Sequence, residues 1–422
     1  MKPRAARVVI VGGGFGGLYA ASYLGRSELR DYGVRVTLVD RKNYFTFTPL
    51  LAEVAAGTLG REHVTHPFRA LARRYGFEFV QASISSIDLE RQAVVTEQAE
   101  LPYDYLVMAM GGEPRYFNND NLERSSIPFA SVNDALAVRG RVIGALERAT
   151  LIADETERRR LLTFVIAGAG PAGVEVASEI SNLANHVLRP FYHVPPMTKV
   201  VLADGGDRIL SGFDEDLAEA GLARLRERGI DVRLRTRIAD ATHGLVTLRG
   251  PQGTEEIPAH TLVWTAGTAP VGWISKLPIP TVGAAVKVDE FLRVAGRTNV
   301  FAVGDVTALT DERTGRPYPR VAPIAISQGV RAAANIENDV LGRDLEPYQA
   351  FHAGKIVSLG GGVALVDILG MKISGFLAWW IYRTTYLLKL VGTKNKIRVL
   401  LTLVLNRLFD PDITYEAGDS RP

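Results

Sequence analysis

The chain has 422 residues, of which 47% are hydrophobic and 23% charged, an ordinary globular composition with enough length for two or three domains. It contains no cysteine, which excludes disulfides, thiolate metal sites and any dithiol electron relay. Residues 371–409 contain seven Lys and Arg and no Asp or Glu, so this segment carries a charge of +7. Because the whole chain has a net charge of +3, the remaining residues carry −4. We therefore expect no nucleic-acid binding. The histidines form no cluster, and no metal site is expected.

The first motif is a glycine turn between a strand and a helix. Residues 8–11 form a short apolar run typical of a buried strand, and a helical pattern follows the turn. The turn places Gly12, Gly14 and Gly17 at GxGxxG spacing. These glycines allow the tight turn, the approach of a pyrophosphate to backbone N–H groups, and the packing of helix on strand, respectively. Asp40 ends the next strand, where its carboxylate can accept hydrogen bonds from a ribose. The alternative is a tight turn that binds nothing.

A second fingerprint of the same kind opens about 156 residues later. A strand at 164–167 leads to Gly168, Gly170 and Gly173, again at GxGxxG spacing, and then to a helix. Two such motifs in one chain predict two bound dinucleotides. Asp204 ends the following strand, and a carboxylate there favours a free 2′-hydroxyl over a 2′-phosphate. We therefore expect NADH rather than NADPH.

Two further strands end in glycines. The buried strand at 105–110 is followed by Gly111, and the strand at 300–303 delivers Gly304 and Asp305 to a turn on the cofactor side. Asp305 can accept a hydrogen bond from a polyol such as the ribityl chain of FAD. It could equally be a helix cap.

In chain order, these motifs resemble the flavoproteins with two dinucleotide-binding domains, and most of all the type II NADH dehydrogenases, which are single-chain NADH:quinone oxidoreductases. The resemblance rests on NYFTFTPLLAEVAAGTL (43–59), GAGPAGVEVASEI (168–180), GFDEDLAE (212–219) and a basic, aromatic tail with AWW and LVGTKNK. It implies an α/β fold with two Rossmann-like dinucleotide-binding domains and a C-terminal amphipathic helical region that binds membranes. The implied domains are an FAD domain at 1–120 and 290–350, an NADH domain at 121–289, and a membrane-anchoring region at 351–422.

The same resemblance implies which residues contact each cofactor. On the FAD side they are Gly12, Gly14, Phe15, Gly17, Asp40, Arg41, Pro49, Leu50, Gly111, Gly304, Asp305, Ala322 and Ala325. On the NADH side they are Gly168, Gly170, Pro171, Gly173, Asp204 and Gly267.

Two residues are the catalytic candidates. Glu175 begins the helix after the second fingerprint, with Glu179 one turn later on the same face. By resemblance Glu175 lies near the nicotinamide and flavin, where it orients the nicotinamide or helps supply protons to a reduced acceptor. The alternative is a carboxylate favoured by the helix dipole. The family's quinone-site pattern, AQxAxQ, falls on residues 321–329, where two alanines match but Pro323 and Ser327 replace glutamines. Gln328 is expected to stand in for them.

The C-terminal tail predicts a helix lying in a lipid surface. Its apolar residues recur at helical spacing, its flanks are basic, and aromatic residues precede it. The stripe comprises Ile397, Leu400, Leu401, Val404 and Leu408, the flanks Lys396, Arg398 and Arg407, and the aromatics Phe376, Trp379, Trp380, Tyr382 and Tyr386. No stretch approaches 18 uncharged apolar residues, so the tail should not span a membrane. A dimerisation helix or a lid on the core are the alternatives.

Without cysteines, a reduced flavin must pass electrons directly to an outside acceptor. We therefore expect FAD-dependent oxidation of NADH with two-electron transfer to a membrane quinone, menaquinone or ubiquinone, without proton pumping. No secretory signal precedes the first strand, which predicts the cytoplasmic face of the cell membrane, with anionic lipid bound by residues 371–409. A homodimer is compatible with this tail. The alternatives are a soluble NADH-dependent ferredoxin-type reductase and a flavin-bound redox sensor or scaffold.

Overall fold

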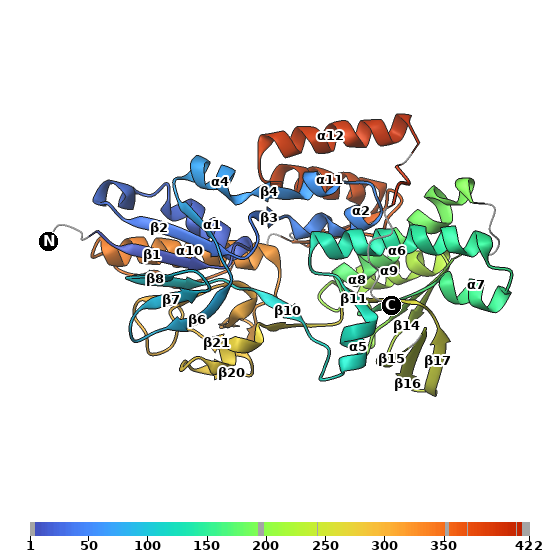
Figure 1. Ribbon diagram of the computed structural model, residues 1–422, viewed down its shortest axis with the longest axis horizontal. Helices are drawn as coiled ribbons and strands as arrows, with labels where there is room; N and C mark the ends of the chain where they lie inside the picture. The colour runs from blue at the N-terminus through green and yellow to red at the C-terminus, as the bar shows by residue number, and fades with distance from the viewer. Residues whose placement is uncertain are drawn as a thin grey trace. The chain divides into compact units, whose positions relative to one another are not determined.

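The computed structural model (Figure 1) describes residues 5–192, 198–242, 244–350, 354–368, 370–410 and 412–415. The chain forms two compact units, and each contains one of the two glycine fingerprints. Unit 1 comprises Met1–Thr46, His66–Glu113 and Thr268–His352, and unit 2 comprises Phe47–Thr65, Pro114–Gly267 and Ala353–Pro422. Which nucleotide each unit binds stays a prediction at this point.

Unit 1 is built on a five-stranded parallel sheet in the order β22-β9-β1-β2-β5. Its strands are β1 (Arg7–Val11), β2 (Arg35–Asp40), β5 (Glu78–Gln81), β9 (Tyr105–Met108) and β22 (Val300–Ala302). The central strand β1 is buried from Val8 to Val11, as its continuous apolar run requires. Helices α1 (Phe15–Leu24) and α10 (Ala322–Val340) pack closely at two glycines, Gly16 and Gly329. A Cβ added at Gly329 would lie only 2.2 Å from the carbonyl oxygen of Gly16, so a larger residue would push the helices apart.

Smaller elements complete unit 1. Helix α4 spans Phe68–Tyr75, and β6 (Ile84–Asp88), β7 (Ala93–Thr96) and β8 (Glu100–Pro102) form an antiparallel sheet. Strands β20 (Thr281–Val282), β21 (Ala285–Lys287) and β23 (Thr307–Ala308) form a further small sheet next to the Gly304 turn.

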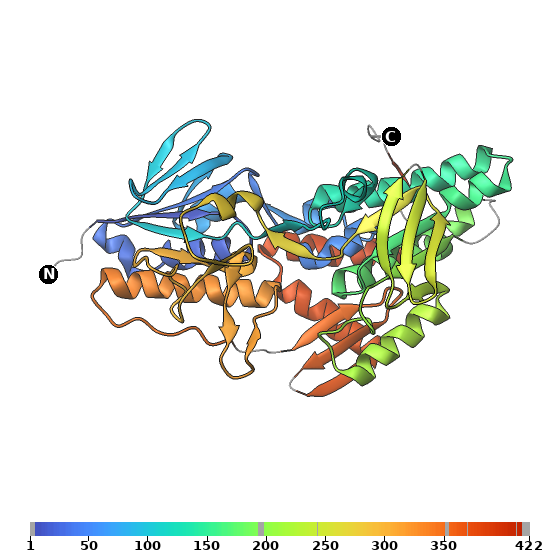
Figure 2. The same ribbon diagram turned by 90° about the horizontal axis from the view of Figure 1, so that it is seen from below.

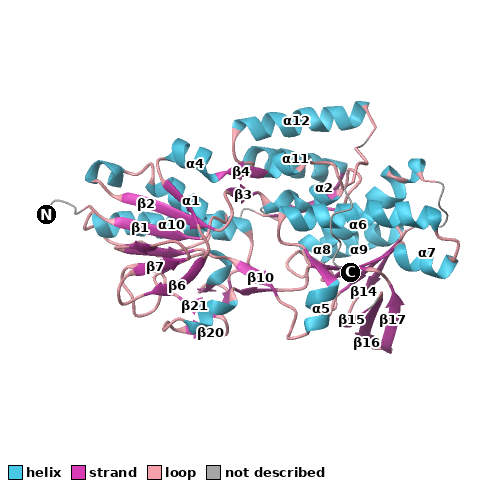
Figure 3. Ribbon diagram, viewed as in Figure 1, coloured by secondary structure: helices cyan, strands magenta, loops and turns pink. Residues whose placement is uncertain are grey.

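Unit 2 repeats the plan around the second fingerprint, with a parallel sheet in the order β11-β18-β12-β13-β14. Figure 3 draws the strands of both units in magenta and the helices in cyan. Its strands are β11 (Ser126–Pro128), β12 (Thr163–Ala167), β13 (Lys199–Ala203), β14 (Ile230–Arg233) and β18 (Thr261–Trp264). Its helices include α5 (Asp120–Ser125), α6 (Val132–Leu151), α7 (Glu155–Leu161), α8 (Pro171–Asn182) and α9 (Glu215–Glu227). An antiparallel sheet of β15 (Arg237–Thr242), β16 (Leu245–Gly250) and β17 (Gly253–Pro258) packs into the same core.

The C-terminal segment and residues 47–65 also belong to unit 2. Strands β26 (Lys355–Ser358), β27 (Ala364–Ile368) and β28 (Met371–Gly375) form an antiparallel sheet beside α9 (Figure 2). Lys372 on β28 pairs with Asp214 and Asp216 at the start of α9. The last two helices are α11 (Phe376–Lys389) and α12 (Thr393–Leu408), drawn in red in Figure 1. Helices α2 (Leu51–Ala55) and α3 (Arg61–Val64) come from the early segment.

The predicted fold class is confirmed: the chain has two Rossmann-like units with parallel sheets and ends in a helical C-terminal region. Among the described residues, none of the helices combines the length and the apolar character that crossing a bilayer demands.

Candidate active site

The first glycine turn in unit 1 has the geometry expected of a pyrophosphate cradle. Gly12 has φ +98°, which favours glycine, and a Cβ added at Gly17 would lie 1.9 Å from the carbonyl oxygen of Gly12. Beside Gly14, by contrast, no atom of the described residues lies within 4 Å of where a Cβ would point, and none of their side chains caps the start of α1. An open helix N-terminus of this kind fits an anionic pyrophosphate.

Asp40 at the end of β2 has a role that the sequence did not reveal. Its Oδ2 accepts the backbone N–H of Gly13 at 2.6 Å, and its Oδ1 accepts that of Lys42 at 2.8 Å. The carboxylate therefore fixes the glycine turn as well as the end of the strand. Each carboxylate oxygen accepts more than one hydrogen bond, which leaves capacity for a ribose hydroxyl.

The second glycine turn, in unit 2, reproduces this arrangement. Gly168 also has φ +98°, and a Cβ added at Gly173 would lie 1.8 Å from the carbonyl oxygen of Gly168, whereas the space beside Gly170 is open. Asp204 accepts the N–H of Ala169 through Oδ2 and that of Gly206 through Oδ1, both at 2.6 Å. Both units therefore fit a dinucleotide at the predicted motif.

Thr265 supports the second turn and was not singled out in the sequence. Its hydroxyl donates to the carbonyl of Ala167 at 2.6 Å and lies 3.1 Å from that of Gly168. Gly267, two residues later, has φ +88° and accepts the N–H of Arg115 at 3.2 Å. Pro171 is the first residue of α8, where its missing N–H costs no helical hydrogen bond. The only sequence signal for Thr265 is its position directly after a buried strand.

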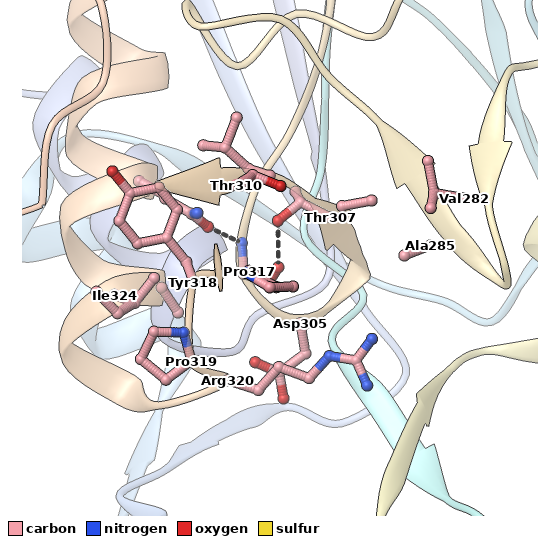
Figure 4. A pocket seen from close by; sticks show the side chains of 15 residues that line it. Val282, Ala285, Asp305, Thr307, Thr310, Pro317, Tyr318, Pro319, Arg320 and Ile324 are labelled. Atoms are coloured by element: carbon pink, nitrogen blue, oxygen red, sulfur yellow. Dashed lines mark hydrogen bonds between the residues drawn. The ribbon is translucent and has the colours of Figure 1, made fainter. Parts of the chain in front are cut away.

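A cavity of about 300 Å³ lies in unit 1 next to the turn after β22 (Figure 4). Residues lining it include Gly304, Asp305, Thr307, Tyr318, Arg320 and Ala325. Burial raises the pKa of Asp305, and the nearby Arg320 guanidinium opposes that rise. Ala325 lies against Gly304, and Ala322 is the first residue of α10.

Gln328 lies at the wall of this cavity and is only 1% exposed. Its Oε1 accepts the backbone N–H of Gly304 at 2.7 Å, one of the two bonds dashed in Figure 4. The side chain therefore holds the Gly304–Asp305 turn in place, and its role toward a quinone stays a prediction. Ser327, which stands at a glutamine position of the family pattern, is hydrogen-bonded to Tyr348 at 2.8 Å.

The remaining residues expected on the FAD side divide between the two units. Phe15 packs edge-on against Phe45, with the ring centroids 5.1 Å apart. Arg41 is exposed, and its backbone carbonyl accepts a hydrogen bond from the side-chain amide of Gln81. Gly111 has φ +68° with open space beside it. Pro49 and Leu50 lie in unit 2, in the short helical turn Thr48–Leu50.

Glu175 on α8 is buried in unit 2. Its Oε1 accepts the backbone N–H of Ser358 at 3.0 Å. Burial raises the pKa of Glu175 to about 8; the Ser358 hydrogen bond opposes this shift, and the charges of Glu53 and Glu179 add to it. A carboxyl group with this pKa is protonated at neutral pH and can release that proton, as a general acid must.

Glu53 on α2 and Arg383 on α11 form a buried ion pair that the sequence analysis missed. Glu53 is 2% exposed, and Arg383 donates to its Oε2. The sequence predicts that Tyr382 is an aromatic residue at the lipid interface, but its side chain is only 1% exposed, so that prediction was wrong. Burial raises the pKa of Tyr382, and the nearby charges of Glu175 and Glu53 add to the rise. The prediction failed because a helix with one buried and one exposed face hides part of its aromatic residues from solvent.

Helix α12 is held by three uncharged polar side chains that bond to the early segment of unit 2. Asn395 and Asn406 donate to the carbonyls of Thr65 and Thr58, and Thr402 is hydrogen-bonded to His63 at 2.8 Å. The apolar stripe predicted from the sequence is exposed along its whole length: Ile397, Leu400, Leu401, Val404 and Leu408. Large exposed apolar surfaces of this kind mark interaction sites.

Comparison with known proteins agrees with this geometry. Residues 6–329 match the pyridine nucleotide-disulphide oxidoreductase family. A type II NADH:quinone oxidoreductase of Mycobacterium tuberculosis, Ndh, is 33% identical over 95% of this chain and 88% of its own length, and a second one, NdhA, is 32% identical over 93% and 85%. The chain belongs to the type II NADH:quinone oxidoreductase family. The structure of NDH2 from Plasmodium falciparum in complex with NADH has the same fold, with a TM-score of 0.90, 19% identity and coverage of 97% and 100%.

Type II NADH:quinone oxidoreductases are flavoproteins, so the cofactors of this chain are FAD and NADH. The broader family name includes disulphide chemistry, but this chain has no cysteine with which to perform it.

Proposed function

We propose that this chain oxidises NADH and transfers two electrons through FAD to a membrane quinone, without pumping protons. The observation that carries the proposal is the pair of matching glycine turns, with open space at Gly14 and at Gly170, in a chain without cysteine. We assign FAD to the first turn and NADH to the second.

The residues of each turn have defined tasks in this proposal. The N-terminus of α1 holds the pyrophosphate of FAD and that of α8 holds the pyrophosphate of NADH, because unsatisfied N–H groups and the helix dipole favour negative charge there. Asp40 and Asp204 hold the ribose next to each turn. FAD, when bound, supplies the acceptor for the hydride of NADH and the donor of electrons to the quinone.

Glu175 is the proposed source of a proton for the reduced quinone. Reduction of a quinone to a quinol requires two electrons and two protons, and NADH supplies both electrons but only one proton with its hydride. The second proton must come from the protein and ultimately from water. The buried carboxyl of Glu175, with a pKa of about 8, holds such a proton at neutral pH.

We further propose that α12 docks on an anionic membrane surface at the cytoplasmic face. The stripe of α12 that faces away from the protein is apolar, while two of its asparagines bond inward, which is the reverse of a helix that faces water. Lys394, Lys396, Arg398 and Arg407 lie on the same helix, and each cation near anionic lipid contributes about 1 kcal/mol. A membrane is the source of a lipid-soluble quinone, so docking delivers the acceptor.

Rapid-mixing spectroscopy tests the redox proposal. The purified protein should be yellow, lose flavin absorbance when NADH is added under nitrogen, and regain it when a menaquinone or ubiquinone analogue follows. A protein that is bleached by NADH but recoloured only by a ferredoxin would favour a soluble reductase. Slow turnover with every acceptor would favour a redox sensor or scaffold.

Flotation with liposomes tests the membrane proposal. The triple variant Leu400→Ser, Leu401→Ser, Leu408→Ser should lose binding to vesicles containing phosphatidylglycerol while its NADH-to-flavin reaction stays intact. The matched control is Leu151→Ser, because Leu151 is an exposed apolar residue at the end of α6 and does not belong to the stripe of α12. Unchanged flotation of the triple variant would overturn docking. If that variant also changes from dimer to monomer in sedimentation, the stripe is a contact between two copies of the chain.

A further inference from the structure

Unit 2 contains a buried cluster of carboxyl groups that the proposed mechanism uses only in part. Glu175 and Glu179 lie one turn apart on α8, and Glu53 on α2 faces both of them. Glu179 is 7% exposed and Glu53 is 2% exposed. Isolated carboxylates are costly to bury, so three in one cluster require compensation by protons or cations.

One cation balances one of the three carboxylates. Arg383 donates to Glu53, and the Arg383 charge also acts on Glu179. The pKa of Glu179 is raised to about 7 by burial and by Glu53, against the opposing charges of Arg383 and Arg228. At neutral pH Glu179 is therefore close to half-protonated, which suits a group that must both accept and give up a proton.

The cluster also contains polar atoms without partners. The Oε1 of Glu53 and the hydroxyl of Tyr382, which is 1% exposed, are both buried and have no hydrogen-bond partner among the described residues. Buried polar groups in proteins are almost always satisfied, and water is the usual partner where no side chain reaches. These two atoms next to the carboxyl groups are therefore the places in the cluster where a bound water would find a partner.

Glu179 has a second cation nearby. Arg228, just after α9, acts on Glu179 and donates to the carbonyl of Leu359 at 2.9 Å. Arg228 is half-buried, so this neighbour of Glu179 reaches solvent in part. Glu175, in contrast, is held against Ser358.

We propose that Glu179 reloads Glu175 with a proton after each quinone reduction. This inference rests on the proposed function. In each turnover a proton leaves Glu175 for a quinone oxygen, the proton of Glu179 moves to Glu175, and Glu179 takes a proton from water. One proton is thus consumed from solvent for each NADH oxidised, as the overall reaction requires. The Glu53–Arg383 pair acts as a positioning pair.

The charges that act on Glu179 come from three elements: Glu53 on α2, Arg383 on α11 and Arg228 at the end of α9. Two tyrosines of α11, Tyr382 and Tyr386, lie in the electrostatic field of Glu175 and Glu53 instead.

The test compares Glu179→Gln with the wild type as FAD-loaded full-length enzymes. Turnover with a soluble quinone analogue should fall about tenfold or more in this variant, while the single-turnover reduction of bound flavin by NADH stays unchanged. Removing the Glu179 charge also lowers the pKa of Glu175, so the loss of activity at high pH should begin at a lower pH. Glu179→Asp should restore part of the turnover.

A matched control and a second readout separate this role from a structural one. Glu337→Gln makes the same change at a buried glutamate of unit 1, which accepts from Tyr23, and should leave quinone turnover unchanged. Infrared titration of the protein without substrates should show a carboxylic acid C=O band that titrates near neutral pH in the wild type and is missing in Glu179→Gln.

The outcomes distinguish this inference from the proposed function. If the wild type fails to reduce any quinone, the proposed function falls. If the wild type reduces quinone and Glu179→Gln matches it in turnover and in pH profile, Glu179 has no part in proton delivery. Slowed flavin reduction by NADH in Glu179→Gln would also overturn the inference, because it would assign Glu179 to nucleotide binding.

Discussion

Arg383 on α11 donates to Glu53 on α2, although 330 residues of sequence separate the two side chains. The charge of Glu53 acts on both glutamates of α8, so Arg383 supplies the positive charge that balances one of three buried carboxyl groups. This pair also connects the C-terminal tail to the early segment at 47–65. Its removal should therefore have consequences for stability before any for catalysis.

The first prediction concerns this pair. Arg383→Met should lower the free energy of unfolding by about 3–5 kcal/mol, because it leaves the buried Glu53 carboxylate without its partner. The double variant Arg383→Met, Glu53→Gln should recover most of that loss. Urea denaturation followed by circular dichroism measures both. As a control, Arg91→Met breaks an exposed pair with Glu100 and should cost at most about 1 kcal/mol. Equal losses of unfolding free energy in Arg383→Met and Arg91→Met would show that the Glu53–Arg383 pair is no more important to stability than an exposed pair.

The second prediction concerns pH. Glu175 has a pKa of about 8 in the folded chain, against 4.5 when it is free. Between these values the folded protein keeps a proton that the unfolded chain has released, so its stability falls as pH rises through this window. The destabilisation that Glu175 causes is absent below about pH 4.5 and complete above about pH 8. Between these values the free energy of unfolding falls by at most about 1.4 kcal/mol per pH unit.

Glu175→Gln isolates this contribution, because glutamine keeps an oxygen that can accept from Ser358 but cannot ionise. Its free energy of unfolding, measured from pH 5 to pH 8, should decline less steeply than that of the wild type. Parallel curves for the two proteins would show that Glu175 keeps an ordinary pKa.

The third prediction separates two glycines of one motif. Gly170 has φ −71° and open space around it, so Gly170→Ala should fold normally and retain FAD, but its KM for NADH should rise tenfold or more. Gly173→Ala should instead be strongly destabilised, because the added Cβ would meet the carbonyl oxygen of Gly168 at 1.8 Å. Thermal melting and flavin content, measured next to NADH titrations, check both. Normal NADH binding by Gly170→Ala would remove the pyrophosphate from this turn.

The fourth prediction uses the two acids that hold the glycine turns. Asp204→Asn should narrow the preference for NADH over NADPH, because it removes the charge that repels a 2′-phosphate. It should also raise the KM for NADH, since an amide NH₂ cannot accept the N–H that one of the carboxylate oxygens now accepts. The ratio of kcat/KM for the two nucleotides is the measurement.

Asp40→Asn is the matched control for that change, because Asp40 makes the same bonds at the first turn. It should weaken FAD retention during gel filtration and leave the nucleotide preference as it is. A shift in NADH preference from Asp40→Asn, with none from Asp204→Asn, would exchange the two cofactor assignments.

The sequence by itself determined the two strand–glycine–helix units and their acids. These features are local: the steric need for glycine at Gly12 and Gly168, and the apolar runs of β1 and β12, act within a few dozen residues. The sequence also predicted helix α12, because its apolar residues recur at helical spacing.

Only the tertiary structure decided what the remaining side chains contact. The sequence around Gln328 cannot show that its amide supports Gly304, and nothing near Glu53 announces Arg383 as its partner. Periodicity reveals that α12 has two faces, but not that the polar one packs inward. Contacts between distant segments depend on how the whole chain folds. The local spacing of residues therefore cannot predict which segments come into contact.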